Sequence, residues 1–439
     1  MTTIKKALVS FFGKDVVDFS IKTEVIAGFT TFLTMMYIII VNPDIIGNNT
    51  DMSYAGVLTA TVLVSALSTI LMGLFANNPI ALAPGMGLNA FFVYGVVLGQ
   101  NIDWRSALGI VFWSGVIAII LSLTKVRDLI ARSIPTSLKS AVTVGIGLFI
   151  AFIGFVKSGV IISNENTVVK MSELGPQQIL FWAGLIISSI LIIKKIPGAL
   201  IIGIITTTIL SIPFGRVWGP ETLVKWSGIT SSPDFSLLFQ LDIVNTFSLT
   251  FLPVIFAFLF TDMIDSITLF IGVSEAGNLK DKDGQPKNMR ASLLVDSMAT
   301  ASSGLLGTSS ATSYVESLSG IEQGGRTGLT AVVCGLCFIP FLFFAPLISI
   351  VPGFATAQAL VLVGVFMIGS VININWKDYE ESIPAFLMLM LIPLTYSITN
   401  GIIWGFLSWT ILKVLNGKWR EINVGIIIID IVSIMALVI

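Results

Sequence analysis

The sequence predicts an all-α polytopic membrane protein with fourteen transmembrane segments, arranged as two sets of seven in an inverted repeat. Three observations support this fold class. Hydrophobic residues occupy 55% of the 439 positions and charged residues only 11%, a composition that excludes a soluble protein. The apolar residues fall into fourteen stretches separated by short polar connections. The third stretch of each set of seven is interrupted, which is the pattern that inverted repeats leave in a membrane sequence.

The fourteen stretches have lengths suited to crossing a bilayer, or to crossing it in a broken form. Their connections leave no room for a large soluble domain. In chain order we expect spans at about 24–42, 54–75, 79–99, 105–124, 136–156, 176–193, 197–214, 247–273, 290–306, 308–321, 327–350, 355–373, 382–397 and 399–416.

The distribution of basic residues orients these spans. With the N-terminus in the cytoplasm, 19 of the 24 lysines and arginines fall on the cytoplasmic side, as the positive-inside rule requires. The five exceptions are Arg105, Lys157, Lys170, Arg216 and Lys225. We therefore expect a multi-pass protein of the cell membrane with a cytoplasmic N-terminus.

The two ends of the chain lie outside these spans. Residues 1–23 carry apolar side chains at helical spacing and no signal-peptide pattern, which favours a helix on the cytoplasmic membrane surface. The hydrophobic tail, 421–439, is short and contains Asp430. It could be a fifteenth span or a peripheral helix, and the sequence leaves both open.

Two interrupted segments mark the centre of the predicted fold. Residues 77–92 read NNPIALAPGMGLNAFF, and residues 307–325 read GTSSATSYVESLSGIEQGG. Backbone this rich in glycine, proline and hydroxyl residues cannot face lipid, because hydrocarbon offers no hydrogen-bond partners. Such segments at corresponding positions of two halves indicate a binding site near the membrane midplane.

Acidic side chains accompany these segments. Glu316 lies inside the second one, next to Ser317, and Asp262 and Asp265 lie three residues apart in the eighth span. An ionised aspartate at the centre of a membrane helix costs about 2.5–3.5 kcal/mol, and this spacing puts both on one helical face. We expect these acids to face the protein interior. Asp296 of the ninth span is a weaker candidate for the site, and a packing or gating role is an equal alternative for it.

Carboxylates without a basic residue at the same depth disfavour an anionic ligand. They suit a cation or a neutral ligand rich in N–H donors, such as a purine base, whose N–H edge can donate to a carboxylate. Aromatic residues such as Phe91 and Tyr314 could stack on its flat faces. Two cysteines in an apolar span are expected to be buried, and the chain shows no basic and aromatic cluster for nucleic acid.

Several segments together resemble one known family. The sequence is similar to the nucleobase cation symporter superfamily, and within it to the azaguanine-type permeases for adenine, guanine and hypoxanthine. The similarity spans nearly the whole chain and is carried by AGFTTFLTMMYIIIVNP at 27–43, NNPIALAPGMGLNAFF at 77–92, GIGLFIAFIG at 145–154, FTDMIDSITLFIGV at 260–273 and GTSSATSYVESLSGIEQGGRTGLTAVV at 307–333.

The resemblance implies a division into two domains and short strands in the broken spans three and ten. The expected parts are the N-terminal segment 1–23, a core domain of 24–124 and 247–350, a gate domain of 125–246 and 351–420, and the tail 421–439. The substrate would lie between the broken spans, against span eight.

The resemblance also implies roles for individual residues. Asp262 and Glu316 correspond to the substrate-binding acids of spans eight and ten. Asn89 falls where span three contributes a side chain, and Tyr314 and Val315 line the same pocket. The polar and aromatic neighbours Ser317 and Phe91 complete the predicted site.

Proton coupling is expected to use carboxylates. Uracil-type relatives have a histidine where this chain has Ser266, and the chain contains no histidine at all. Asp262 or Asp265 would therefore carry the proton. Coupling to sodium remains an open alternative.

The sequence as a whole predicts a secondary transporter that imports purine bases by alternating access, and not an enzyme. We expect no cofactor, catalytic residue or metal site, H⁺ as the coupling ion, and a purine base and the lipid bilayer as partners, with a homodimer possible. One alternative is a same-fold carrier of another substrate such as an anion. Another is an intramembrane aspartyl protease, whose two aspartates would share a proton, although its GxGD pattern is missing.

Overall fold

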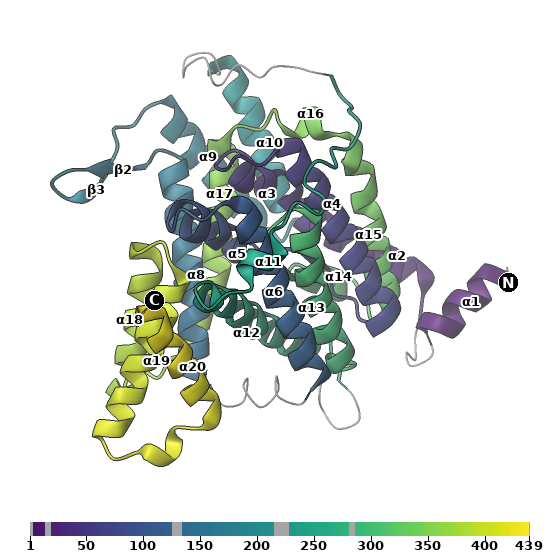
Figure 1. The fold of residues 1–439 in the computed structure, drawn as a ribbon. Coiled ribbons are helices and arrows are strands. Elements are labelled where there is room, and N and C mark those ends of the chain that lie inside the picture. Colours follow the sequence, from purple (N-terminus) through teal and green to yellow (C-terminus); the bar gives the residue numbers. More distant parts are fainter. Residues whose placement is uncertain (1–2, 14–18, 125–133, 215–227, 281–285, 439) are drawn as a thin grey trace.

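The computed structural model describes residues 3–13, 19–124, 134–214, 228–280 and 286–438. Figure 1 shows a predominantly helical molecule, with the β2–β3 hairpin and α16 near one end and the connection between α19 and α20 near the other. The basic residues Lys14, Lys125, Arg127, Arg132, Arg216, Lys225 and Lys282 lie outside the described residues.

The described residues of the first half of the chain form α-helices, two π-helical segments, one 3₁₀ segment and three strands. They are α1 (Thr3–Phe12), α2 (Ile21–Met35), α3 (Ile38–Ile46), α4 (Tyr54–Leu71), the π-helix η1 (Met72–Ala76), β1 (Leu82–Pro84), α5 (Met86–Ala90), the π-helix η2 (Phe91–Leu98), α6 (Trp104–Leu123), α8 (Thr136–Lys157), β2 (Ile161–Asn164), β3 (Val168–Met171), α9 (Pro176–Ile193), α10 (Ala199–Ser211) and the 3₁₀ segment η3 (Ile212–Phe214).

The described residues of the second half include one further strand. Its elements are α11 (Ile243–Thr246), α12 (Leu252–Ala276), α13 (Met289–Leu306), β4 (Ala311–Ser313), α14 (Ser317–Glu322), α15 (Gly328–Phe338), η5 (Ile339–Phe343), α16 (Ala345–Ile348), α17 (Gly353–Ile368), η6 (Gly369–Asn373), α18 (Tyr379–Leu394), α19 (Ile398–Leu415), η7 (Trp419–Glu421) and α20 (Val424–Val438).

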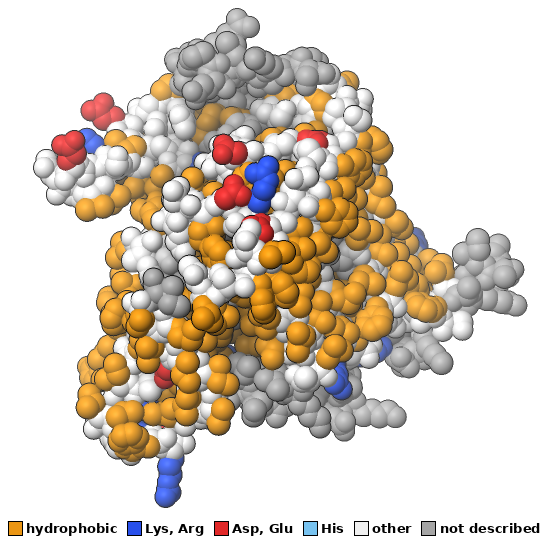
Figure 2. All heavy atoms as spheres, in the orientation of Figure 1, with side chains coloured by type: hydrophobic (Ala, Val, Ile, Leu, Met, Phe, Trp, Pro, Cys, Tyr) orange, Lys and Arg blue, Asp and Glu red, His pale blue; other side chains and the backbone are white. Residues whose placement is uncertain are grey.

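Eight helical segments among the described residues are long and apolar enough to cross a membrane: Ile21–Ile46, Tyr54–Ala76, Trp104–Leu123, Thr136–Lys157, Pro176–Ile193, Leu252–Glu275, Gly353–Asn373 and Ile398–Leu415. The chain is therefore a multi-pass membrane protein. Figure 2 shows apolar side chains over much of one face, with charged residues mostly toward its two ends. Several other predicted spans fall below this length because their helices are short or broken, as at α5 and α14.

Two helical bundles form the molecule. In the first bundle, α13 packs on α6, and α15 packs on α2 and α4. In the second bundle, α8 packs on α17 and α18, α18 on α19, and α9 on α10. Contacts of α12 and α5 with α8 join the two. The division into a core and a gate domain stays a prediction.

The two interrupted segments meet as a strand pair inside the first bundle. β1 and β4 are antiparallel, with Leu82 opposite Ser313 and Pro84 opposite Ala311. Backbone hydrogen bonds from Gly85 to Ser310 (2.9 Å) extend the pair. All residues of both strands are buried, so their backbone groups find partners in each other instead of in lipid. The short strands expected in broken spans three and ten are present.

The ends of the chain form helices as well. The predicted N-terminal helix appears as α1, although part of segment 1–23 lies outside the described residues. The tail forms α20, which packs on α19 and α12. Its Asp430 is buried at 8% exposure and accepts a hydrogen bond from Thr410 Oγ1 (2.7 Å). This contact explains how an acid is tolerated in an apolar helix. The β2–β3 hairpin was not predicted.

Candidate functional site

A cavity of about 300 Å³ lies between the strand pair of the first bundle and helices α8 and α17 of the second. We call it the central cavity. Its size is at the lower end of the range for small-molecule pockets. It is lined by Tyr37, the turn 85–88 after β1, Thr143, residues 265, 268, 269, 272 and 273 of α12, residues 312–316 and 318, and residues 363, 366, 367 and 370 of the second bundle.

A second cavity of about 290 Å³ adjoins the first. We call it the vestibule. It is lined by parts of α2 and α14 and by the turn from α9 to α10, including Lys195, Glu322 and Gln323. Val315, Glu316 and Phe366 line both cavities. The vestibule therefore leads from the α9–α10 turn to the same acid that lines the central cavity.

Glu316 is held by a tyrosine from the first span. The Tyr37 hydroxyl donates a hydrogen bond to Glu316 Oε1 (2.7 Å). Tyr37 is 1% exposed and lies at the break between α2 and α3. Glu316 itself is at the N-terminal boundary of α14, three residues after the end of the strand β4. The α2–α3 break at Tyr37 and the break between β4 and α14 at Glu316 thus place a fixed carboxylate in the cavity wall.

Asp265 is the acid of α12 that lines the central cavity. Thr143 Oγ1 of α8 donates a hydrogen bond to Asp265 Oδ1 (3.5 Å). This contact joins α12 of the first bundle to α8 of the second. Any movement of one bundle against the other would change the surroundings of this carboxylate.

Asp262 and Asp296 lie behind the strand pair instead of in the cavity wall. Asp262 is 1% exposed, and Thr300 Oγ1 lies 3.1 Å from its Oδ2 and 2.8 Å from the Ala311 carbonyl oxygen. Asp296 accepts hydrogen bonds from Ser266 (2.5 Å) and Ser313 (2.9 Å). Direct contact between Asp262 and a ligand stays a prediction. In this arrangement the Asp262 side chain supports β4 through Thr300, which contacts both Asp262 and the carbonyl oxygen of Ala311.

Of the other predicted site residues, some line the central cavity and the rest are buried behind it. Tyr314 and Val315 line the central cavity, and the Tyr314 hydroxyl donates to the Pro84 carbonyl oxygen (2.6 Å). Ser317 is fully buried and accepts a hydrogen bond from the Ala81 amide (3.0 Å). Asn89 and Phe91 are also fully buried and do not line the cavity. Their predicted binding roles stay untested, and their present contacts support the broken spans.

Sequence reasoning missed Tyr37 and Thr143. Tyr37 stands in the apolar run MYIIIV, and nothing in that run indicates a helix break. Thr143 is one of many hydroxyl residues in apolar spans, where such side chains commonly bond to their own helix. Only the packing of α3 and α8 against the strand pair identifies them as part of the site.

Comparison with known proteins identifies the family. The chain matches the Permease family over residues 22–403. The chain belongs to this family. Adenine permease AdeQ of Escherichia coli is 41% identical to this permease over 413 residues, covering 93% of the chain and 91% of AdeQ. Guanine/hypoxanthine permease PbuO of Bacillus subtilis is also 41% identical, over 418 residues, covering 93% of the chain and 95% of PbuO.

A solved structure supports the fold independently. The transmembrane domain of the bicarbonate transporter BicA from a cyanobacterium superimposes on this permease with a TM-score of 0.61 at 16% identity, covering 95% of the chain and 97% of BicA's domain. At this identity the likeness concerns the fold alone. The central cavity of the permease has acidic side chains but no lysine or arginine among its described lining residues.

Proposed function

We propose that this permease imports purine bases across the cell membrane by secondary active transport, with the base bound in the central cavity. The observation that carries the proposal is the pair of carboxylates, Glu316 and Asp265, in one cavity of about 300 Å³ beside a buried strand pair. A purine is neutral and flat and carries N–H groups that can donate to a carboxylate. Relatives named for adenine and for guanine/hypoxanthine are equally similar, so the proposal covers the purine class and not one base.

Tyr37 positions the acid in this proposal. Its hydrogen bond occupies Glu316 Oε1 and leaves the other carboxylate oxygen, with the remaining lone pair of Oε1, for N–H donors of the base. The phenol is buried and cannot rotate freely. A fixed acceptor lowers the cost of ordering the site on binding.

Proton coupling is the second part of the proposal. The chain has no histidine, so a membrane-embedded carboxylate must carry the proton. Asp265 is favoured because it lines the cavity and contacts Thr143 of the opposite bundle. Binding of a proton there would change a contact between the two bundles. Asp262 remains a second candidate through its contact with Thr300.

The third part of the proposal is the transport movement, which the presence of two bundles supports. We propose fourteen segments in two inverted sets of seven, a cytoplasmic N-terminus, and rocking of the second bundle, as gate domain, against the first, as core domain. The vestibule would then be the cytoplasmic entrance, because Lys195 at its rim belongs to the predicted cytoplasmic set of basic residues.

The experiment is uptake of labelled hypoxanthine, guanine, adenine and uracil into proteoliposomes. We expect saturable uptake of at least one purine and none of uracil. Glu316→Gln should abolish uptake while the protein remains folded. Glu322→Gln is the matched control, because Glu322 lines only the vestibule. Full purine uptake by the Glu316→Gln variant would remove this site assignment, and uptake of bicarbonate without purines would favour an anion carrier.

A further inference from the structure

We propose that Asp44, Lys157 and Thr356 form a latch that holds the two bundles together at the end of the molecule opposite the vestibule, and that opening of this latch is a step of the transport cycle. None of its three residues lines the central cavity. It extends the proposed transport function from substrate binding to the control of access.

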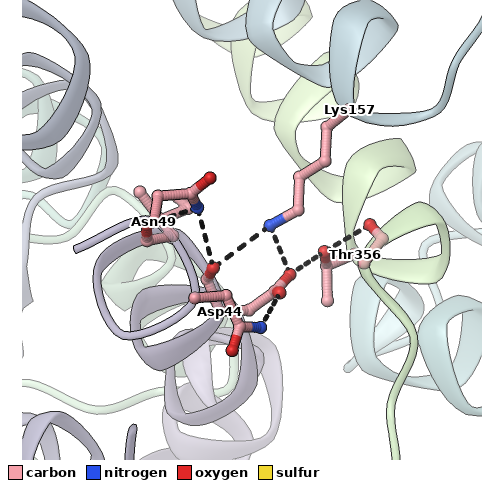
Figure 3. A network of polar contacts seen from close by, with 7 residues as sticks. Asp44, Asn49, Lys157 and Thr356 are labelled. Atoms are coloured by element: carbon pink, nitrogen blue, oxygen red, sulfur yellow. Dashed lines mark hydrogen bonds and ion pairs between the residues drawn. The ribbon is translucent and has the colours of Figure 1, made fainter. Parts of the chain in front are cut away.

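Three elements supply the latch. Asp44 is in α3 of the first bundle, Lys157 is the last residue of α8, and Thr356 is in the first turn of α17, both in the second bundle. Lys157 Nζ lies 2.5 Å from Asp44 Oδ2 and 3.4 Å from the Asp44 carbonyl oxygen. The Thr356 hydroxyl donates to the same Oδ2. Figure 3 shows the lysine and the threonine approaching Asp44 from separate helices.

The latch is largely removed from solvent. The side chains of Asp44 and Lys157 are 4% and 14% exposed, and Thr356 is fully buried. Asn48 donates a hydrogen bond to Asp44 Oδ1 (2.8 Å), so both carboxylate oxygens have donors. A buried charge that loses its partner but stays buried is strongly unfavourable, whereas two charges that separate into water regain their hydration. The ion pair is therefore favourable in two states of the protein: one in which the pair is intact and buried, and one in which both charges are fully hydrated.

The latch and the vestibule lie at opposite ends of the molecule. Lys157 ends α8 immediately before the β2–β3 hairpin, and α9 begins at Pro176 shortly after it. The vestibule is lined by Ile192 and the turn that follows α9. The 18 residues of α9 span about 27 Å. The bundles are thus open to the central cavity at the far end of α9 and joined at the hairpin end.

A second contact closes the hairpin end. Tyr94 of η2, in the first bundle, packs against Tyr396 between α18 and α19, with ring centroids 6.2 Å apart. Tyr396 also packs on Phe149 and Phe152 of α8. An aromatic contact can slide or separate at small cost, so the ion pair is the part that makes closure at this end strong.

Thiol labelling tests the latch without needing a substrate. The reporter is Phe366→Cys in a chain whose Cys334 and Cys337 are replaced by alanine; Phe366 is 43% exposed and lines both cavities. A membrane-impermeant maleimide is applied to oriented proteoliposomes from one side at a time. Lys157→Met should lower the labelling rate from the vestibule side by about fivefold or more and raise it from the hairpin side. Lys157→Arg should restore the parent pattern.

The matched control is Lys413→Met. Lys413 is 4% exposed and pairs with Glu380 at 2.8 Å, but both residues lie in α18 and α19 of the second bundle. Loss of this ion pair should leave the labelling rates from the two sides unchanged. Thr356→Val is the second latch variant, which keeps the ion pair and should shift labelling in the same direction by a smaller factor.

Two results would overturn the latch. One is a folded Lys157→Met or Thr356→Val protein with parent labelling from both sides. The other is an equal shift in Lys413→Met, which would make the effect one of general destabilisation. Because labelling requires no base, failure of the purine assignment would leave this test intact, and failure of the latch would leave purine uptake by the parent protein unaffected.

Discussion

Replacing Tyr37 with phenylalanine removes one hydroxyl group from the central cavity and should weaken purine binding. The ring stays in place, so the packing at the α2–α3 break is retained. The lost interaction is the 2.7 Å hydrogen bond to Glu316 Oε1. Hydrogen bonds to a charged group contribute about 1.5–3 kcal/mol, which corresponds to about a tenfold or larger change in affinity. We therefore expect the KM for the transported purine to rise about tenfold or more.

The assay is the initial rate of labelled purine uptake in proteoliposomes, together with equilibrium binding to the purified protein. The double variant Tyr37→Phe with Glu316→Gln should bind no more weakly than Glu316→Gln alone, because the tyrosine acts through the acid. Tyr314→Phe is the matched control. Its hydroxyl donates to the Pro84 carbonyl oxygen, so its loss should lower thermal stability and show additive effects with Glu316→Gln. An unchanged KM in Tyr37→Phe would refute the positioning role.

Three further predictions concern coupling, packing and a connecting segment. Asp265→Asn should abolish purine accumulation driven by an imposed pH gradient but retain exchange of labelled for unlabelled base; accumulation by the variant would exclude Asp265 as the proton carrier. Gly304→Val should lower the free energy of unfolding in detergent by about 1–3 kcal/mol, because its Cβ would lie 2.6 Å from a backbone oxygen of α6. Gly369→Ala serves as control, because a Cβ added there has no atom within 4 Å. Burial raises the pKa of Asp234, but hydrogen bonds from Ser53 and Ser236 have the larger effect and hold the pKa below its ordinary value. Because solvent screens this carboxylate, Asp234→Asn should cost at most about 0.5 kcal/mol at neutral pH. The difference from the parent in thermal unfolding should vanish as the pH falls through that lowered pKa.

The broken spans were the most predictable part of the fold. Glycine, proline and hydroxyl residues at 77–92 and 307–325 cannot be accommodated in lipid-facing helices, and the resemblance supplied the strands that the structure places there. Boundaries of long spans followed from hydropathy. The break at Tyr37 could not be predicted, because β-branched and aromatic residues continue across it without a glycine or an interruption of the apolar run.

The candidate site was predicted only in part for a related reason. The three-residue spacing of Asp262 and Asp265 puts both on one side of α12, but it does not decide which of them reaches a cavity. That choice depends on where α12 meets α8 and β4. The structure puts Asp265 at the meeting with α8 and Asp262 at the meeting with β4, beside Thr300. Tertiary packing, which the periodicity of a single helix does not contain, separates the two acids.

The pairing of β1 with β4 has a consequence for biosynthesis. Leu82 finds its partner at Ser313, so more than half of the polypeptide must leave the ribosome before the third span can complete its hydrogen bonds. Until then this stretch has unsatisfied amides and carbonyls that hydrocarbon cannot accept. Until then the third span must lie where water or another protein can bond to these backbone groups. The transport site can form only late, when residues 311–317 enter the membrane.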